Sequence, residues 1–289
     1  MPTYSYSRIS TFEKCPLKFK FRYIDKIVPE IEKTIEAHLG KTVHSSLEYL
    51  YLNVKGGKIP SIDEIIVSYT DEWEKEFTPD TIIVNHDLTE KDYFNKGIQF
   101  IVSYYTQHHP FDDNTLEVEK RILLELDEEG SYKIQGFIDR LAYNLETGEY
   151  EIHDYKTANY PPSIESLKKD RQLALYSLAI KKLYGKDKEV SLIWHFLAHN
   201  KKIHIKKNNE ELEKIRNETL ETIKKIESTE KFPPHKSKLC DWCEYKSICP
   251  AWGNALPRLD KQKSLGEYPT INKYIKDYEE NGKDLDIWN

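Results

Sequence analysis

The sequence lacks several features that would place it in other classes of protein. No apolar run approaches the length of a membrane-spanning helix, and the N-terminus has no apolar segment typical of signal peptides. The chain contains no Walker-type phosphate-binding loop, which excludes a helicase motor of its own. Internal repeats and low-complexity segments are also absent. We therefore expect an intracellular, cytoplasmic protein with no membrane partner.

Positive charge is not in excess either. The 289 residues include 43 Lys and Arg against 49 Asp and Glu, which gives a formal net charge of −6. The overall field of such a chain repels nucleic acid, so any contact with DNA has to come from a local basic patch. Hydrophobic residues make up 38% and charged residues 32%, which is typical of a soluble globular protein with one large domain or two modest ones.

Basic and aromatic residues alternate near the N-terminus. The basic residues there are Arg8, Lys14, Lys18, Lys20, Arg22 and Lys26, and the aromatic residues are Phe12, Phe19, Phe21 and Tyr23. Basic side chains bind phosphates, and aromatic rings stack on the bases of a single strand. Solvated charge and core aromatics are the alternative. The candidate phosphate contacts are Arg8, Lys14, Lys18, Arg140 and Arg171.

The periodicity of apolar residues changes along the chain. Helical spacing predicts helices in residues 36–55, 61–77 and 90–108, after an N-terminal helix capped by Ser10 or Thr11 and ending near Pro16. Residues 115–158 alternate and contain the turn sequences DEEG and LETG, which predicts a three-stranded antiparallel meander. The segments that follow are a helix ending at Gly185, a strand pair (189–198 and 201–207) and a helix over 209–228. This order indicates an α/β fold with helical additions.

Two acids and a lysine stand at the ends of predicted strands. Asp139 lies in GFIDR on the second strand of the meander, and Asp154 and Lys156 lie in HDYKT on the third. Residues two apart on a strand share a face, and the neighbouring strand brings Asp139 close to them. Clustered carboxylates repel unless a cation lies between them, and Mg²⁺ prefers such oxygen ligands. The alternative is a structural salt bridge between Asp154 and Lys156 on a solvated face.

The order of these motifs resembles the RecB-like branch of the PD-(D/E)XK nuclease superfamily. The matching segments are GKTVHSSLE, GFIDR, HDYKT and RQLALY, and the resemblance spans residues 5 to 250. It implies a restriction-endonuclease-like core, in which a mixed sheet with an antiparallel meander is flanked by helices. We expect a single nuclease domain over residues 1–256, followed by a polar tail over residues 257–289.

The same resemblance implies which residues bind a metal. His44, Asp139 and Asp154 match the metal ligands of the family, and the carbonyl of Tyr155 is a further ligand. The ion would be Mg²⁺ or Mn²⁺. From the residues alone, a lone His44 on a helix is more often a core or surface histidine than a metal ligand.

Catalytic roles follow in the same way. Lys156 matches the catalytic lysine, which acts together with Asp139 and Asp154. Gln172 and Tyr176 match a Q-x-x-x-Y motif that organises the site and the DNA, although one helical turn apart they also fit plain helix surface and core. The two other residues considered are Glu119, an outer-shell acid, and His153, a structural residue on the opposite face from Asp154.

Four cysteines form a second candidate site. They are Cys15, Cys240, Cys243 and Cys249. In a reducing compartment this spacing suggests a metal site rather than disulfides. One cysteine before the core and three after it resemble the iron–sulfur nucleases of the superfamily, of the AddB and CRISPR spacer-acquisition types. The resemblance implies a 4Fe–4S cluster in a C-terminal cysteine-rich loop, joining residues 1–30 to 232–256. Zn²⁺ and free buried thiols are the alternatives.

These observations predict a metal-dependent DNA nuclease that acts in DNA repair, recombination or a related pathway. The expected substrate is single-stranded DNA or DNA with free ends, and a separate helicase is a candidate partner. The first alternative is a non-catalytic or accessory DNA-binding subunit of a helicase–nuclease complex. The second alternative is a zinc-stabilised binding module whose acids are surface charge.

Overall fold

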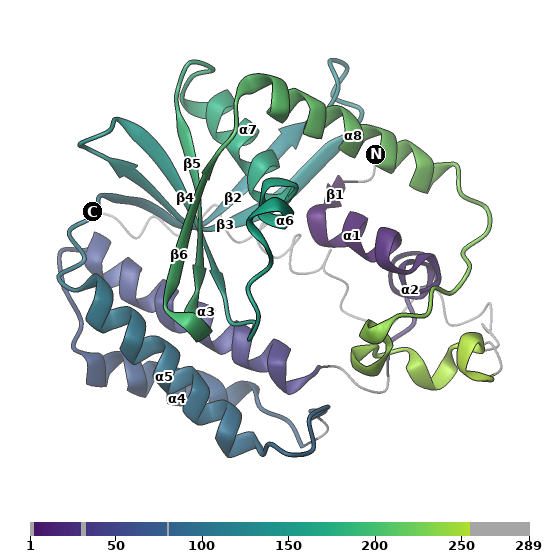
Figure 1. Cartoon of the computed structure of the whole chain (residues 1–289), viewed down its shortest axis with the longest axis horizontal. Helices are drawn as coiled ribbons and strands as arrows, with labels where there is room; N and C mark the ends of the chain where they lie inside the picture. The colour runs from purple at the N-terminus through teal and green to yellow at the C-terminus, as the bar shows by residue number, and fades with distance from the viewer. Residues whose placement is uncertain (1–2, 30–32, 80, 255–289) are drawn as a thin grey trace, which may run out of the picture. The chain divides into compact units, whose positions relative to one another are not determined.

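A six-stranded mixed sheet forms the centre of the fold (Figure 1). The structure, a computed structural model, describes residues 3–29, 33–79 and 81–254. The strands are β1 (Thr3–Ser5), β2 (Thr115–Glu125), β3 (Lys133–Asn144), β4 (Glu149–Lys156), β5 (Val190–Phe196) and β6 (Lys201–Lys206). Antiparallel pairing joins β2, β3 and β4 in sequence, which confirms the predicted meander. It also joins β5 to β6, as the sequence predicts.

Two parallel pairs make the sheet mixed. β5 runs parallel to β4 from Val190 to Phe196, after a crossover through α6 and α7. β1 runs parallel to the start of β3. The sequence analysis missed β1, because three residues are too few to show an alternating pattern.

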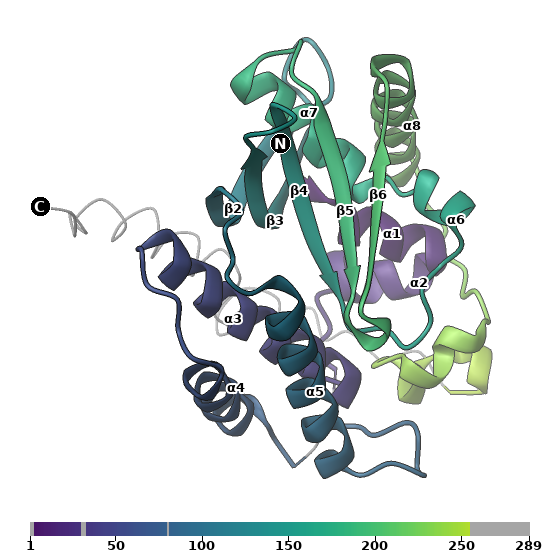
Figure 2. The same cartoon turned by 60° about the vertical axis from the view of Figure 1, so that its left-hand side comes forward.

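Helices cover both faces of the sheet. They are α1 (Tyr6–Lys14), α2 (Pro16–Phe19), α3 (Ile35–Lys55), α4 (Ile62–Glu76), α5 (Glu90–His108), α6 (Ile164–Lys168), α7 (Gln172–Tyr184) and α8 (Asn209–Glu227). One core lies between the sheet and α1, α7 and α8, and a second lies among α3, α4 and α5. Figure 2 shows the sheet between these two helix groups.

Local sequence signals explain where most helices begin. Ser61 and Glu64 form a capping box at the start of α4, and Thr89 and Asp92 form another at the start of α5. The buried stripe of α3 contains Val43, Leu47, Leu50 and Tyr51, which confirms the predicted helical face.

The predicted start of the first helix was wrong, whereas its predicted end near Pro16 is confirmed, because α1 ends at Lys14. α1 begins at Tyr6, and Ser5 caps it by accepting a hydrogen bond from the backbone N–H of Arg8 at 3.2 Å. Thr11 lies inside the helix, where its hydroxyl donates to the carbonyl of Ser7. Pro16 begins the next helix, α2, because proline is well suited to a first helical position. A short π-helix, Lys20–Ile24, follows α2.

The C-terminal part of the fold is a loop with three short 3₁₀ turns. They are Lys238–Trp242, Lys246–Ile248 and Pro250–Trp252. The compact unit that contains the sheet ends at Asn254. The predicted boundary at residue 256 and the tail over residues 257–289 lie outside the described residues. Within the described ranges, every helix is too short or too polar to cross a membrane.

Candidate metal site and catalytic residues

The candidate site lies where β3 and β4 part. Their pairing runs from Asn144 and Glu149 to Arg140 and His153 and then stops, while β4 continues alongside β5. The next residue on each strand beyond this point is an acid, Asp139 on β3 and Asp154 on β4. Because Asp154 is still paired in register with β5, its main chain is fixed although β3 no longer supports it.

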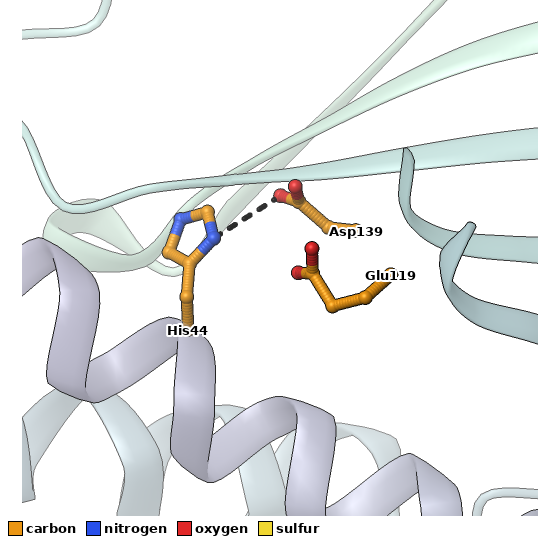
Figure 3. A group of neighbouring side chains, drawn as sticks. All are labelled: His44, Glu119 and Asp139. Atoms are coloured by element: carbon orange, nitrogen blue, oxygen red, sulfur yellow. Dashed lines mark ion pairs between the residues drawn. The ribbon is translucent and has the colours of Figure 1, made fainter. Parts of the chain in front are cut away.

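Three elements meet at Asp139. Its Oδ2 accepts a hydrogen bond from the backbone N–H of Tyr155 at 2.9 Å and lies 3.4 Å from Nδ1 of His44 on α3. Nε2 of His44 lies 2.8 Å from the carbonyl oxygen of Tyr155. Figure 3 shows the imidazole of His44 pointing from its helix toward Asp139. The structure thus brings together three of the predicted metal ligands, although their role as ligands stays a prediction.

Glu119 of β2 completes this group. One donor atom each from His44, Glu119 and Asp139 lie within 4.8 Å of one another (Figure 3). Among the described residues, this is the one group of at least three His, Cys, Asp or Glu side chains that meets that spacing. The sequence analysis treated Glu119 as an outer acid, whereas the structure places its carboxylate beside those of the main candidates.

A break in strand alternation explains how Glu119 reaches the site. Glu119 has a left-handed backbone with φ of +47°, which is uncommon for a residue other than glycine. Val118 packs against the core of α3 to α5, yet Ile122, four residues later, faces the core beneath α7. Regular alternation would put both on one face. On β3, Ile138 and Leu141 lie in the same core, although residues three apart on a regular strand point to opposite faces. Both strands therefore reverse faces at the level of Glu119 and Asp139.

The carboxyl groups of this cluster hold protons more tightly than usual. Burial and the nearby charge of Asp154 raise the pKa of Asp139 to about 6, although His44 and Lys156 oppose the shift. Burial and the charges of Asp139 and Glu48 raise the pKa of Glu119 to about 7. Negative charge is therefore crowded here, and a divalent cation would relieve the repulsion.

Asp154 and Lys156 form an ion pair beside this group. Lys156 Nζ lies 2.6 Å from Asp154 Oδ2, and Asp154 is only 3% exposed. The salt bridge considered as an alternative is therefore present, but its carboxylate is buried rather than on a solvated face. Burial lowers the pKa of Lys156, but attraction to Asp154, Asp139 and Asp170 outweighs it and raises the pKa overall. Lys156 is thus a fixed positive charge rather than a proton acceptor.

Gln172 and Tyr176 of α7 lie over the acids. Gln172 Nε2 donates to Tyr176 Oη at 3.4 Å. Burial raises the pKa of Tyr176, and the nearby charges of Asp154 and Asp139 add to the effect. Gly136 of β3 makes room for the phenol, because a Cβ there would lie 2.3 Å from Tyr176 Oη.

The basic residues proposed for phosphate contact differ in their surroundings. Arg140 was predicted wrongly, because it is 1% exposed and its guanidinium is bonded inside the protein. Arg171 forms an ion pair with Glu13, and Lys18 pairs with Glu244 at 2.6 Å. Arg8 stacks over Tyr4 with 4.6 Å to the ring centroid. His153 is buried against His195, consistent with a structural residue.

The four cysteines line one cavity of about 270 Å³. All four thiols are free. The backbone N–H of His235 donates to Cys15 Sγ, and that of Ser237 donates to Cys240 Sγ, both at 3.4 Å. Basic residues line the same cavity, namely Lys14, Lys18, Arg22, Lys236 and Lys246. The N-terminal helices and the C-terminal loop therefore meet at the cysteines.

Two solved structures are similar to this chain over most of its length. The chain is 13% identical to a protein of Eubacterium rectale named "Putative exonuclease", over 94% of this chain and 92% of that chain, with a TM-score of 0.49. It is 18% identical to the protein SSO0001, over 75% of this chain and 95% of that chain, with a TM-score of 0.36. A search of the curated proteins found no match.

A family model gives the decisive result. The model of the PD-(D/E)XK nuclease superfamily matches residues 3–250, which include His44, Glu119 and Asp139, the ion pair of Asp154 and Lys156, and all four cysteines. The chain therefore belongs to the PD-(D/E)XK nuclease superfamily.

Proposed function

We propose that this protein is a metal-dependent deoxyribonuclease that acts as an exonuclease on single-stranded DNA or DNA ends. The observation that carries the proposal is the meeting of His44, Glu119 and Asp139 next to the ion pair of buried Asp154 and partly exposed Lys156. Superfamily membership supports hydrolysis of a nucleic-acid phosphodiester. The presence of the whole set favours an enzyme over a non-catalytic DNA-binding subunit, because an inactive copy would be expected to have lost some of these residues.

The donor set fits a hard divalent cation. His44, Glu119, Asp139 and the Tyr155 carbonyl supply one imidazole and three oxygen groups within a short span. Mg²⁺ and Mn²⁺ favour such oxygen-rich sites, and the raised pKa values of the two acids support a cation site, because a cation would relieve the repulsion between the carboxylates. A bound ion would polarise the scissile phosphate and lower the pKa of a water molecule. Asp154 is the remaining proposed ligand.

Lys156 supplies a fixed positive charge at the site. Its pairing with buried Asp154 holds the ammonium group in one place. A pre-placed charge in a partly dehydrated site stabilises the negative charge that develops on the phosphate during hydrolysis. Gln172 and Tyr176 present an amide and a hydroxyl from the opposite helix, and these groups orient the substrate.

The test is degradation of end-labelled single-stranded DNA with Mg²⁺, Mn²⁺ or EDTA. The wild type should cleave with either metal and not in EDTA. Lys156→Ala should cleave DNA roughly 10²–10³-fold more slowly than the wild type, as expected when a group that stabilises the transition-state charge is removed. Lys225→Ala, which removes an exposed lysine on α8, is the matched control and should cleave normally. Metal-independent cleavage, or full activity of Lys156→Ala, would contradict the proposal.

We also propose that the cysteine cavity holds a 4Fe–4S cluster rather than Zn²⁺. Four thiolates facing one cavity suit either group. Bonds of about 2.3 Å to one tetrahedral Zn²⁺ would place its ligands about 3.8 Å apart. In the described part of the chain, no three of the sulfur atoms gather within 4.8 Å, which favours a larger group. The cluster would join the N-terminal helices to the C-terminal loop within one nuclease domain.

Anaerobic purification tests the cluster separately from cleavage. The protein should be brown, absorb near 400 nm and contain about four iron and four acid-labile sulfide per chain, as the four-thiolate ligand set requires. Cys249→Ala should lose the colour and the iron. Stoichiometric zinc in place of iron would favour the Zn²⁺ alternative, and the nuclease assignment would be unaffected.

A further inference from the structure

A buried polar network lies behind the candidate site. It joins Arg140 on β3 and His153 and Tyr155 on β4 to His195 on β5, and it continues to Tyr104 on α5 and Tyr51 on α3. Buried polar groups are costly unless they are fully bonded, so such a network needs an explanation beyond packing.

Arg140 is the centre of the network. Its Nε donates to the hydroxyl of Tyr155 at 3.1 Å, and its Nη2 donates to His153 Nδ1 at 2.9 Å. Its Nη1 donates to Asp113 and, at 3.2 Å, to the hydroxyl of Thr115. The guanidinium also lies over the ring of Tyr51, 4.1 Å from the centroid. All three nitrogens are therefore occupied, and the planar group has one orientation available to it.

Tyr155 connects the network to the site. Its side chain is buried, and its hydroxyl accepts from Arg140 and lies 3.3 Å from that of Tyr104. Its main chain faces the acids, because its N–H donates to Asp139 at 2.9 Å and its carbonyl lies 2.8 Å from His44 Nε2. A rotation of the Tyr155 peptide units would change both contacts at once.

Helix α3 is held at two points along the same side. His44 contacts Asp139 and the carbonyl of Tyr155, whereas Tyr51, two turns later, stacks on Arg140 and lies 2.7 Å from the hydroxyl of Tyr104. The bonds of Arg140 therefore hold the strand that presents the carbonyl, and the stacking of the Tyr51 ring on Arg140 holds the helix that presents the imidazole.

We infer that Arg140 is a positioning residue that sets the metal affinity of the site by fixing the main chain of Tyr155 through its hydroxyl. The inference rests on the proposed function, since it takes the Tyr155 carbonyl and Asp139 as ligands. Groups one step removed from a metal hold its ligands in place, and their loss typically weakens metal binding. Arg140 has this relation to the site although its side chain never reaches it.

The test measures Mn²⁺ binding by the electron paramagnetic resonance signal of free Mn²⁺, using the full chain well below its unfolding temperature. Tyr155→Phe removes the hydroxyl and keeps the carbonyl. Arg140→Lys keeps the positive charge but loses the planar guanidinium and its several N–H donors. Each should weaken Mn²⁺ binding about ten-fold, in line with losses of partners that orient metal ligands. The double variant should be no weaker than the worse single variant, because both remove the same hydrogen bond.

Tyr51→Phe is the matched control. It removes a buried hydroxyl from the same network and keeps the ring beneath Arg140, but its hydroxyl bonds to Tyr104 rather than to Tyr155. It should lower the unfolding temperature while binding Mn²⁺ like the wild type. A general effect of network damage would instead weaken binding in this control too, and that result would overturn the inference.

Two further outcomes separate this inference from the proposed function. If Asp139→Asn loses Mn²⁺ while Tyr155→Phe binds it normally, the metal site stands and the positioning role is wrong. If the wild type binds no Mn²⁺, both fail. Tyr155→Phe decides the question alone should Arg140→Lys not fold, because it removes a single oxygen atom.

Discussion

Asp139 and Tyr155 are joined by a hydrogen bond of 2.9 Å in which a side chain replaces a missing strand partner. The N–H of Tyr155 would bond to β3 if the two strands stayed paired, but their pairing ends at Arg140 and His153. The carboxylate of Asp139 accepts that N–H instead. The end of the β3–β4 pairing thereby produces both an unpaired strand edge at the site and the contact that holds Asp139.

The left-handed backbone of Glu119 should lower the free energy of unfolding, and the position of its carboxylate in the metal group explains why it is kept. We expect Glu119→Gly to raise the free energy of unfolding by about 1 kcal/mol in EDTA, because glycine adopts positive φ without penalty. The same variant should bind Mn²⁺ more weakly, since a carboxylate is lost from the group. Urea denaturation and metal titration measure the two effects.

Glu117→Gly is the control for this prediction. Glu117 lies two residues away on the same strand and does not have a positive φ. Glycine there should lower the free energy of unfolding, because it adds flexibility to a strand without relieving strain. Equal destabilisation by both variants would show that the backbone at Glu119 is not strained.

Much of the fold could be predicted from the sequence because its signals are local. Helical spacing located α3, α4 and α5, and alternation with turn sequences located the meander. β1 is too short for a periodic signal. The start of α1 was misplaced because Ser5, Ser7, Ser10 and Thr11 all have cap chemistry, and the pairing of β1 with β3 favours Ser5.

The candidate site was predictable in part. Motif order placed His44, Asp139 and Asp154 in one site, and the structure brings the first two into contact. Glu119 reaches the site because strand β2 reverses its faces there, and no pattern in the sequence predicts this reversal. Arg140 was misread because an arginine next to an acid suggests phosphate binding, and only the tertiary structure shows that it is buried.

The stabilisation of the folded protein by bound Mn²⁺ should grow with pH. The raised pKa values of Asp139, to about 6, and of Glu119, to about 7, mean that the folded protein holds protons that the unfolded chain releases near pH 4. These groups therefore lower the stability of the metal-free fold as pH rises from about 4 to about 6–7, and the loss is complete above that range. Metal competes with those protons, so the increase in unfolding temperature caused by Mn²⁺ should be larger at pH 8 than at pH 6.

Differential scanning fluorimetry with Mn²⁺ and with EDTA at each pH measures this effect. Glu119→Gln serves as the control, since it cannot titrate at position 119 and should show a smaller change between the two values of pH. A Mn²⁺ shift that is equal at pH 6 and pH 8 would show that the two carboxyl groups do not bind the ion.

Gly136→Ala should disturb catalysis through Tyr176. The new methyl group would lie 2.3 Å from Tyr176 Oη, so the phenol has to move away from the acids. Overpacking of this kind costs about 1–3 kcal/mol of stability. We also expect a clear fall in kcat, measured by DNA degradation at a temperature where the variant is folded.

Gly97→Ala is the control, because its methyl group would lie 2.0 Å from Tyr69 Oη in the α4–α5 core. It should lose stability and keep its kcat when folded.

Lys14 should contribute to DNA affinity without base preference. It is exposed at the end of α1 and lines the cysteine cavity with four other basic residues, so it belongs to a local patch in a chain of negative net charge. A lysine that contacts a phosphate releases a counterion, so Lys14→Ala should lower the salt slope of single-strand binding by about 0.7. Fluorescence anisotropy in EDTA measures binding without cleavage.

The control is Lys225→Ala, which removes one positive charge from α8, far from Lys14 in the sequence. It should leave the salt slope unchanged. An equal effect of both variants would mean that the DNA responds to net charge alone, because only a specific contact distinguishes one exposed lysine from another.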